Sequence, residues 1–596
     1  MRLSIILPVL LCLPSARPTP TQEPLYPPPD HKLITPTLDA FIRAQISYWN
    51  SSGLSLAVVR RSSPHTSDWQ IEYGSYGTAR ADGTPVSPDT LFAIASDSKL
   101  FLAAGVGLLT HNTSLVPRLR WDTKIREVLP EWGLMDEEME RGTTVQDMLS
   151  HRTGVPRHDL SGYARKGGVS EMISTMRYLR PSTSFREKYQ YNNLMYEALS
   201  HLQPTLLNQS LESYIAEHIF APLGMNSSTY SVADAESRLL PDGTRQLAHG
   251  FHWSMKDALM NQTGVLTASE YFQRPGEEHI WAGAAGILTS VRDLSTWVAM
   301  LLNEGRHPFT NASVIPADVV EHVALGASVS LEKAEFPETS PKVYGCGQNR
   351  FSYRGHEIIE HGGSNPGYKG IVTRLPHDQI GIIVLTNDDD GVRVMEPVKF
   401  RIIDALLGFA EPIDWSHRYV ESVADGIKRN QAVTPRPLPP LLRLPTTPFA
   451  QLQGRFRHGA YGDFAPCLID GGEDCERELQ LKNATLRRIL AASEDVPTLI
   501  VLFKRTFSTY VRLAHFDGNL FNASVIWTTP SANAGEEDVV VGLDRRYLAE
   551  WVPASAAEDE QDGWALKGDF WGKEGKVPEL ESEGRESAEV WFERIS

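Results

Sequence analysis

Apolar runs with strand character stand at both ends of residues 30–428, and helical patterns lie between them. Residues 53–60 and 69–76 have the apolar, β-branched composition of strands, and residues 370–375 and 381–387 predict a hairpin. The pattern therefore predicts an α+β fold in which one antiparallel sheet, assembled from both ends of this region, is flanked by helices.

Two segments of the same region predict helices. Residues 100–109 are apolar on nearly all sides, which is typical of a buried helix. Trp415, Tyr419, Val423 and Ile427 recur every four residues and predict an amphipathic helix that closes the region.

The last part of the chain has a different pattern. Short β-rich runs at residues 498–503 and 524–528 are separated by turns such as Asp517-Gly518. This pattern predicts a small all-β barrel or sandwich.

Proline-rich stretches suggest the boundaries between these parts. Six prolines lie within residues 18–29 and six more within residues 435–448, which predicts an extended leader and a stiff linker. We expect a signal peptide at 1–16, a Pro-rich leader at 17–29, a large domain at 30–428, a linker at 429–448 and a β-domain at 449–596.

Composition excludes several classes of protein. The 596 residues exceed what one core usually supports, and 41% hydrophobic with 22% charged residues is typical of a globular protein. A net charge of −17 without a Lys/Arg run argues against nucleic acid and against an anionic membrane surface as partner. No apolar stretch reaches the ~18–20 residues of a membrane span, so we expect no stable membrane insertion.

The start of the chain predicts secretion. Arg2 is followed by a mostly apolar run at residues 3–13 and by the small residues Ser15 and Ala16, the pattern of a cleavable signal peptide. N-glycosylation sequons agree with this interpretation, and they lie at Asn50, Asn112, Asn208, Asn226, Asn261, Asn311, Asn483 and Asn522.

The cysteines predict at most one disulfide in the mature chain. Cys12 belongs to the signal peptide, and Cys467 and Cys475 are close enough in sequence to pair in an oxidising compartment. Cys346 is then left as a small buried hydrophobic residue. No cysteine pattern suits zinc or redox chemistry, and we expect no cofactor.

The first candidate for chemistry is Ser96, which lies directly before the apolar helix. Lys99 is three residues later, so in a helix its ammonium can reach the Ser96 hydroxyl. A serine needs such a neighbouring base or charge to become a nucleophile. S-x-x-K is weak alone, because Ser330 and Lys333 repeat it in a charged stretch without an apolar helix.

The second candidate is a Y-x-N pattern at Tyr191 and Asn193. A phenol titrates near ~10, and adjacent cations or a tight hydrogen bond can bring it towards a useful base. The pattern also occurs at Tyr48 and Asn50, and for a single tyrosine a half-buried core ring is the simpler interpretation.

The third candidate is the His361-Gly362-Gly363-Ser364 segment before the strand at 370–375. Consecutive glycines at a strand edge allow a substrate backbone to approach, and the amides of Ser364 and Ser96 can together form an oxyanion hole. A metal site is not predicted, because residue 360 is a glutamate where H-E-x-x-H needs a second histidine.

The order S-x-x-K, Y-x-N, H-x-G resembles the serine β-lactamase and penicillin-binding protein superfamily, in particular its class C β-lactamase, D-aminopeptidase and esterase branch. Further segments that resemble sequences of this branch lie at residues 144–156, 222–225, 285–294 and 344–347. After the linker, residues 452–456 with Tyr461-Gly462 are similar to the lipocalin-like β-domain often appended to these hydrolases.

The resemblance implies an antiparallel sheet flanked by helices with an all-helical lobe between its halves. It implies that Ser96 is the acylated nucleophile, that Lys99 holds its proton network and that Tyr191 serves as base and then acid. Asn193 would orient the substrate, and His361 would complete the polar rim. Which of Lys99 and Tyr191 takes the serine proton stays open.

Two residues depart from the family pattern. His361 replaces a lysine of penicillin-recognising members, and a histidine with a pKa near ~6.5 is mostly neutral at pH 7. This disfavours β-lactams and favours esters, amides or peptides with D-residues. Arg152 replaces a small residue and could alter the entrance of the lobe.

Three hypotheses about function follow from the sequence. The first is a secreted serine hydrolase acting on a small molecule or peptide. The second is an acyltransferase of secondary metabolism that uses the same acyl-serine. The third is a non-catalytic descendant that binds ligands through the same cleft, although Ser96, Lys99 and Tyr191 are all present. The oligomeric state is not predicted.

Overall fold

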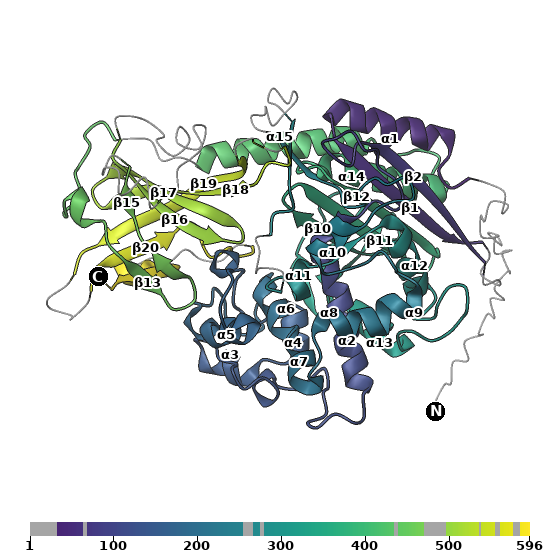
Figure 1. The fold of residues 1–596 in the computed structure, drawn as a ribbon, viewed down its shortest axis with the longest axis horizontal. Coiled ribbons are helices and arrows are strands. Elements are labelled where there is room, and N and C mark those ends of the chain that lie inside the picture. The colour runs from purple at the N-terminus through teal and green to yellow at the C-terminus, as the bar shows by residue number, and fades with distance from the viewer. Residues whose placement is uncertain are drawn as a thin grey trace, which may run out of the picture.

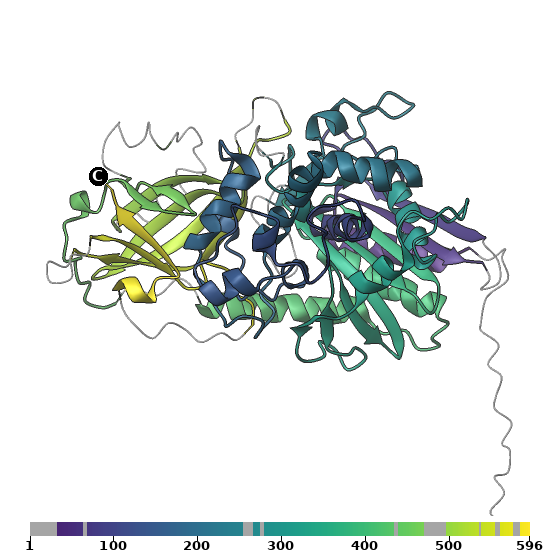
Figure 2. The same cartoon turned by 90° about the horizontal axis from the view of Figure 1, so that it is seen from below.

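The computed structural model describes residues 32–62, 68–253, 266–273, 279–433, 439–469, 479, 496–533, 535, 538–554, 561–575 and 584–595. These residues form a unit of helices around a large sheet and, beside it, a second unit built on a curved sheet (Figure 1). The long helix α15 (Trp415–Val433) extends from the first unit towards the second, and a view from below also shows the two units side by side (Figure 2).

The first unit is organised by one antiparallel sheet of eight strands. Strands from both ends of the unit meet at its centre, where β1 pairs with β12. The order of the strands is β2 (Trp69–Gly77), β1 (Gly53–Arg61), β12 (Ile380–Thr386), β11 (Tyr368–Leu375), β10 (His356–Asn365), β9 (Asn349–Tyr353), β8 (Lys342–Tyr344) and β7 (Ser328–Leu331). The predicted strands, the hairpin and the assembly of the sheet from both ends are confirmed.

The central strands β1 and β12 are mostly apolar and buried almost throughout because both faces of the sheet are covered. Along β1, Leu56 and Val58 pack into a core on one face, whereas Ala57 and Val59 pack into the core on the other. Side chains alternate between the faces of a strand, so a strand buried on both sides becomes a continuous apolar run.

Helices form the outer layers. One face of the sheet packs against α1 (Pro36–Trp49), α14 (Val392–Leu406) and α15, and the other against α12 (Val291–Leu302). The predicted buried helix is α2 (Ser98–His111), and every residue from Ser98 to Gly107 is buried.

A lobe composed mostly of short helices lies between the two halves of the sheet. Its helices are α3 (Glu137–Gly142), α4 (Val145–Leu149), α5 (Gly168–Thr175), α6 (Asn193–Leu199), α7 (Leu202–Leu207), α8 (Leu211–Ile215), α9 (Ala221–Leu223), α10 (Val232–Ser237), α11 (Ala282–Ala285) and α13 (Ala317–Ala324). Two small pairs of strands accompany them, β3 (Phe92–Ala93) with β6 (Leu288–Thr289) and β4 (Gly250–Trp253) with β5 (Leu266–Ser269). The predicted α+β fold with a helical lobe is confirmed.

The second unit is an antiparallel sheet of nine strands. Their order is β14 (Gly462–Phe464), β13 (Phe456–His458), β21 (Val590–Arg594), β20 (Gly563–Lys567), β19 (Val539–Val552), β18 (Leu520–Thr529), β17 (Ser508–Asp517), β16 (Thr498–Arg505) and β15 (Cys467–Leu468).

This sheet curls so that β14 and β16 approach each other through side chains. Arg505 of β16 donates to the backbone oxygen of Asp463 of β14 at 3.2 Å, and the rings of Phe464 and Phe503 lie 6.0 Å apart. The predicted all-β C-terminal domain is therefore confirmed as a curled half-barrel. Its likeness to lipocalins stays a prediction, as do the segment boundaries around it.

Within the described ranges, no helix has both the length and the apolar composition that crossing a bilayer requires.

Candidate active site

Ser96 lies where strained backbone meets the buried helix. It sits in the short 3-10 turn η1 (Ala95–Asp97) directly before α2, and the preceding Ala95 has a φ of +47°. Residues other than glycine rarely adopt this backbone conformation, and they keep it only where the surrounding structure enforces it. Here β10 packs against the turn so closely that a Cβ on Gly363 would lie 2.0 Å from the carbonyl oxygen of Ile94.

Two predicted site residues converge on the hydroxyl of a third, Ser96. The Ser96 Oγ lies 3.0 Å from the Lys99 Nζ and accepts a hydrogen bond of 2.8 Å from the Tyr191 hydroxyl. Lys99 reaches back from the first turn of α2, and Tyr191 precedes α6 by two residues. Elements far apart in sequence thus bring an amine and a phenol to the same serine oxygen.

Lys99 is fully buried and has three hydrogen-bond partners. Besides Ser96, its Nζ donates to the Asn193 Oδ1 at 2.7 Å and to the backbone oxygen of Ala284 at 2.9 Å. Burial disfavours the charged form, and repulsion by the Arg157 guanidinium acts in the same direction, so the pKa of Lys99 falls to about 7.

The environment of Tyr191 keeps it protonated. Burial raises the pKa of its phenol above the ordinary value, although Arg157 and the hydrogen bond to Ser96 oppose the shift. The Lys99 Nζ lies 4.9 Å from the centre of the Tyr191 ring, and the His151 ring packs 4.3 Å from it, centre to centre. Its phenol is therefore a proton donor at neutral pH.

A chain of polar contacts connects Lys99 to the C-terminal unit. The Asn193 Nδ2 donates to the Asp159 Oδ1 at 3.0 Å, and the Asp159 Oδ2 accepts from the Arg157 Nε at 2.8 Å. Arg157 in turn lies 3.6 Å from the carboxylate of Glu574. Asn193 thus contacts the amine of Lys99 and also lines the cavity beside Ser96, and its expected role in orienting the substrate stays a prediction.

Ser96 opens into a cavity of about 250 Å³ between the two units. Its lining includes residues of the lobe, of the β10–β11 hairpin and of the C-terminal sheet; they are Ser96, Arg157, Asp159, Asn193, Trp281, Ala285, Ser364, Asn365, Pro366, Lys369, Asp389, Phe507, Trp527 and Val541. Ser364 therefore shares a cavity with Ser96, as an oxyanion partner must, and that role stays a prediction.

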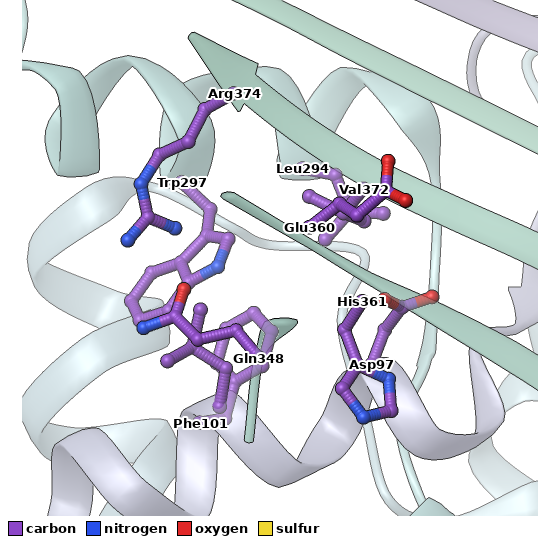
Figure 3. A pocket seen from close by; sticks show the side chains of 10 residues that line it. Asp97, Phe101, Leu294, Trp297, Gln348, Glu360, His361, Val372 and Arg374 are labelled. Atoms are coloured by element: carbon purple, nitrogen blue, oxygen red, sulfur yellow. The ribbon is translucent and has the colours of Figure 1, made fainter. Parts of the chain in front are cut away.

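His361 lies elsewhere than the sequence suggested. It is buried and lines a small enclosed cavity with Asp97 and Glu360 instead of the cavity that Ser96 lines (Figure 3). The His361 Nε2 contacts the Tyr344 hydroxyl at 2.9 Å. Burial and the charge of Lys99 lower the pKa of His361 to about 3, so it is neutral and adds no charge to a polar rim.

The two glycines after His361 differ in their surroundings. Gly362 is exposed, and a Cβ on it would meet only the Gly370 backbone oxygen, at 3.6 Å. Gly363 is buried against the turn that carries Ser96. Close approach of backbones therefore requires the second glycine only.

Arg152 forms an ion pair within the lobe and does not line the Ser96 cavity. Its Nε lies 2.6 Å from the buried carboxylate of Asp147, which also accepts from Arg186. It lines a separate groove with Arg186 and Tyr189. The expected effect of Arg152 on the entrance of the lobe stays a prediction.

The asparagines of the described glycosylation sequons are all at least partly exposed. Asn50, Asn208, Asn226 and Asn311 are exposed and Asn112 and Asn522 are half-buried, whereas Asn261 and Asn483 lie outside the described residues.

Cys467 is disulfide-bonded, but Cys475 lies outside the described residues, so their pairing stays a prediction. Cys346 is free and buried, as expected. In the part of the chain that the structure describes, no group of three or more His, Cys, Asp or Glu side chains is arranged to hold a metal ion.

Comparison with known proteins agrees with this geometry. The family model described as Beta-lactamase matches residues 38–407. The chain belongs to the beta-lactamase family.

Two curated relatives are named unguisins hydrolases. The chain is 29% identical over 440 residues to ungD of Aspergillus violaceofuscus (strain CBS 115571), which covers 70% of this chain and 74% of the relative. It is 26% identical over 435 residues to ungD' of Aspergillus campestris (strain IBT 28561), covering 70% of this chain and 75% of the relative. Together with the family, these relatives identify the chain as a serine hydrolase.

A solved structure shows the same fold over most of the chain. The octameric penicillin-binding protein homologue from Pyrococcus abyssi superposes with a TM-score of 0.50 at 16% identity, covering 89% of this chain and 97% of that chain. The likeness concerns the fold alone and extends over most of this chain.

Sequence reasoning missed several residues of the cavity in this beta-lactamase-family chain. Arg157 and Asp159 follow directly after the family-like segment at 144–156, so their position was a usable signal. Trp281 precedes another such segment by four residues. No sequence signal places Phe507 and Trp527 at this cavity, because a β-rich pattern does not indicate which distant part of the chain the end of a strand will contact.

Proposed function

We propose that this chain hydrolyses an ester or amide through an acyl-enzyme formed on Ser96. The observation that carries the proposal is the pair of contacts at one oxygen, 3.0 Å to the Lys99 amine and 2.8 Å to the Tyr191 phenol. An activated nucleophile needs a base within hydrogen-bond reach, and an acid must then protonate the leaving group.

Lys99 is the general base of this proposal. With a pKa of about 7, roughly half of the amine is neutral at pH 7. Asn193 Oδ1 and the Ala284 oxygen can only accept, so they take the two N–H groups of a neutral amine and leave its lone pair for the Ser96 proton.

Tyr191 is the acid. Its raised pKa keeps the proton on the phenol, whose oxygen lies 2.8 Å from the Ser96 Oγ. The phenol is therefore next to the acyl carbon from which the leaving group departs. Ser96 attacks the carbonyl carbon while its proton passes to Lys99, and the leaving group departs with the proton of Tyr191. Proton transfer from the Lys99 ammonium to the phenolate then restores both groups.

Water completes the cycle. It attacks the acyl carbon while Lys99 takes its proton, the Ser96 oxygen leaves and receives that proton, and the carboxylic acid is released. The amides of Ser96 and Ser364 are the proposed oxyanion donors, and such donors contribute about 2.7–4 kcal/mol each in other hydrolases.

The neutral charge state of His361 bears on which substrates we propose. Penicillin-recognising enzymes are expected to clamp a carboxylate with a cation at this position, and a buried imidazole with a pKa of about 3 cannot do so at neutral pH. Esters, amides and peptides with D-residues are therefore favoured over β-lactams. The relatives named unguisins hydrolases also favour hydrolysis over acyl transfer.

We also propose that the chain is secreted and glycosylated. The signal-like start, the exposed sequon residues Asn50, Asn208, Asn226 and Asn311, and the disulfide-bonded Cys467 support this location.

A serine-directed fluorophosphonate probe tests the proposed chemistry. Mass spectrometry of the labelled protein should find the adduct at Ser96, and Ser96→Ala should lose both labelling and hydrolysis of p-nitrophenyl esters. Ser330→Ala is the matched control, because it removes the serine of the other S-x-x-K copy. Absence of an adduct at Ser96 in folded protein would refute the proposal, and product formed only with an added alcohol or amine would favour an acyltransferase.

A further inference from the structure

We infer that the C-terminal sheet forms one side of the substrate pocket, with Phe507 and Trp527 binding an uncharged aromatic or bulky apolar group of the substrate beside Ser96. This inference rests on the proposed function and extends it by naming the chemistry of the group that is bound.

The two aromatic residues come from neighbouring strand ends of the curled sheet. Phe507 occupies the turn between β16 and β17, and Trp527 lies on β18, beside Val541 of β19. All three are half-buried and line the cavity into which Ser96 opens. Their apolar surface is thus left accessible at the site where an acyl or leaving group must lie.

Trp281 of the lobe joins these residues into one aromatic wall. Its ring lies 4.9 Å from that of Phe507, and Phe507 lies edge-on to Trp527 at 5.2 Å, centre to centre. Phe272 supports both from behind at 6.1 and 5.9 Å. Edge-to-face packing at such distances stabilises aromatic pairs by about 0.5–1.5 kcal/mol, so the wall is preorganised and a substrate ring can extend it.

Backbone hydrogen bonds hold the sheet over the cavity at separate points. The Thr506 amide donates to the Gly162 oxygen at 3.0 Å, and the His158 amide donates to the Trp571 oxygen at 2.8 Å. On another side, the Ala532 amide donates to the Ala268 oxygen at 3.0 Å. Contacts of this kind fix the position of the wall relative to Ser96.

The charged side chains that line the cavity form two internal ion pairs. Arg157 contacts Asp159 at 2.8 Å, and Lys369 contacts Asp389 at 2.8 Å. Burial opposes the charge of Asp389, but Lys369 and His252 hold the pKa of that carboxyl well below its usual range. Because each charge is already compensated, a substrate ammonium or carboxylate would lose hydration here without gaining a partner.

The volume limits what the wall can hold. A cavity of about 250 Å³ is slightly smaller than typical small-molecule pockets, which span about 300–1,000 Å³. It accommodates one side chain and the scissile bond of a larger substrate. The bound element is therefore a neutral, ring-bearing acyl group or flanking residue.

A matched set of esters tests the inference. The substrates are the p-nitrophenyl esters of N-acetyl-phenylalanine and N-acetyl-alanine, each in D and L form, and the same phenylalanine esters with a free amine. The wild type should prefer the N-acetyl-phenylalanine ester of at least one configuration. In Phe507→Ala and Trp527→Ala, kcat/KM for that ester should fall about tenfold more than for the alanine ester, mainly through KM.

Trp591→Ala is the matched control, because Trp591 lies in the same sheet on β21 and outside the cavity lining. It should leave the preference unchanged. Equal losses on both esters, or a preference that survives both variants, would overturn the inference. So would a faster reaction of the free-amine ester.

Calorimetry on the Ser96→Ala protein separates this inference from the proposed chemistry. N-acetyl-phenylalaninamide should bind, and binding should weaken about tenfold when Phe507→Ala or Trp527→Ala is added. Weakened binding without hydrolysis by the wild type would refute only the proposed function. Hydrolysis by the wild type with binding unaffected by both variants would refute only the aromatic wall.

Discussion

The guanidinium carbon of Arg157 lies 4.7 Å from the ring centre of Tyr191. Asp159 fixes this geometry through the Arg157 Nε, and Glu574 of the C-terminal unit lies on the other side of the guanidinium. Arg157 lowers the pKa of Lys99 and opposes the rise in the pKa of Tyr191. The Arg157 guanidinium, although paired with carboxylates, therefore acts on the pKa values of both reacting groups, whereas His361 is neutral.

Removing this charge should move the pH dependence of the reaction. Arg157 repels the ammonium form of Lys99, so Arg157→Gln should raise the pKa of Lys99 and shift the acid limb of kcat/KM to higher pH. Rates with a p-nitrophenyl ester between pH 5 and 9 measure the shift. Arg141→Gln removes a cation from an exposed surface pair and should leave the limb in place. A limb that moves to lower pH, or not at all, would contradict the electrostatic role.

The pKa of Lys99 itself predicts the profile of the unmodified protein. The base acts when neutral, so kcat/KM should rise with pH through about 7 and level off above it. Lys99→Ala should lower kcat by about 10²–10⁴-fold, the usual contribution of general acid–base catalysis. Circular dichroism checks that the variant is folded, and a profile of the wild type that stays flat from pH 5 to 9 would exclude Lys99 as the base.

Tyr191→Phe should separate protonation of the leaving group from packing. The ring and its contacts with His151 and Arg157 remain, but the hydroxyl that donates to the Ser96 Oγ at 2.8 Å is lost. An anilide needs that proton far more than p-nitrophenolate does. We expect a loss of about 10²-fold or more in kcat for an anilide and a smaller loss for the p-nitrophenyl ester of the same acid. Equal losses on both would mean that the hydroxyl positions Ser96 instead.

The two adjacent glycines of β10 offer a matched pair. Gly363→Ala places a Cβ 2.0 Å from the Ile94 oxygen, so the turn that carries Ser96 must move. We expect a loss of about 1–3 kcal/mol in the free energy of unfolding together with loss of fluorophosphonate labelling. Gly362→Ala should retain labelling, since the nearest atom to its Cβ is 3.6 Å away. Thermal denaturation and labelling rates check both variants, and normal labelling of Gly363→Ala would show that the turn tolerates the displacement.

Much of this architecture could be predicted because the relevant signals are local. Residues 53–60 and 380–386 are mostly apolar because both faces of their strands are buried. Such an apolar run can be recognised in the sequence before the partners of the strand are known. The spacing of Ser96 and Lys99 is likewise a property of one helical turn. Such features depend on neighbours within a few residues.

The remainder depends on which way side chains face and on contacts between distant parts of the chain. His361, Gly362 and Gly363 alternate across β10, and the sequence does not fix which of them faces the interior. The burial of His361 is decided by packing against Tyr344. Phe507 lies more than 400 residues after Ser96, and only the docked position of the sheet brings it to the cavity.

The division of the cavity between two units has a consequence for how this enzyme can change. The groups that break the bond lie on one unit, whereas the surface that discriminates among acyl chains lies on one turn and two strands of the other. Substitutions on that surface can change substrate selectivity without altering the Ser96 hydroxyl. Exchange of the whole C-terminal sheet is therefore a route to hydrolases that prefer other substrates but keep the same catalytic residues.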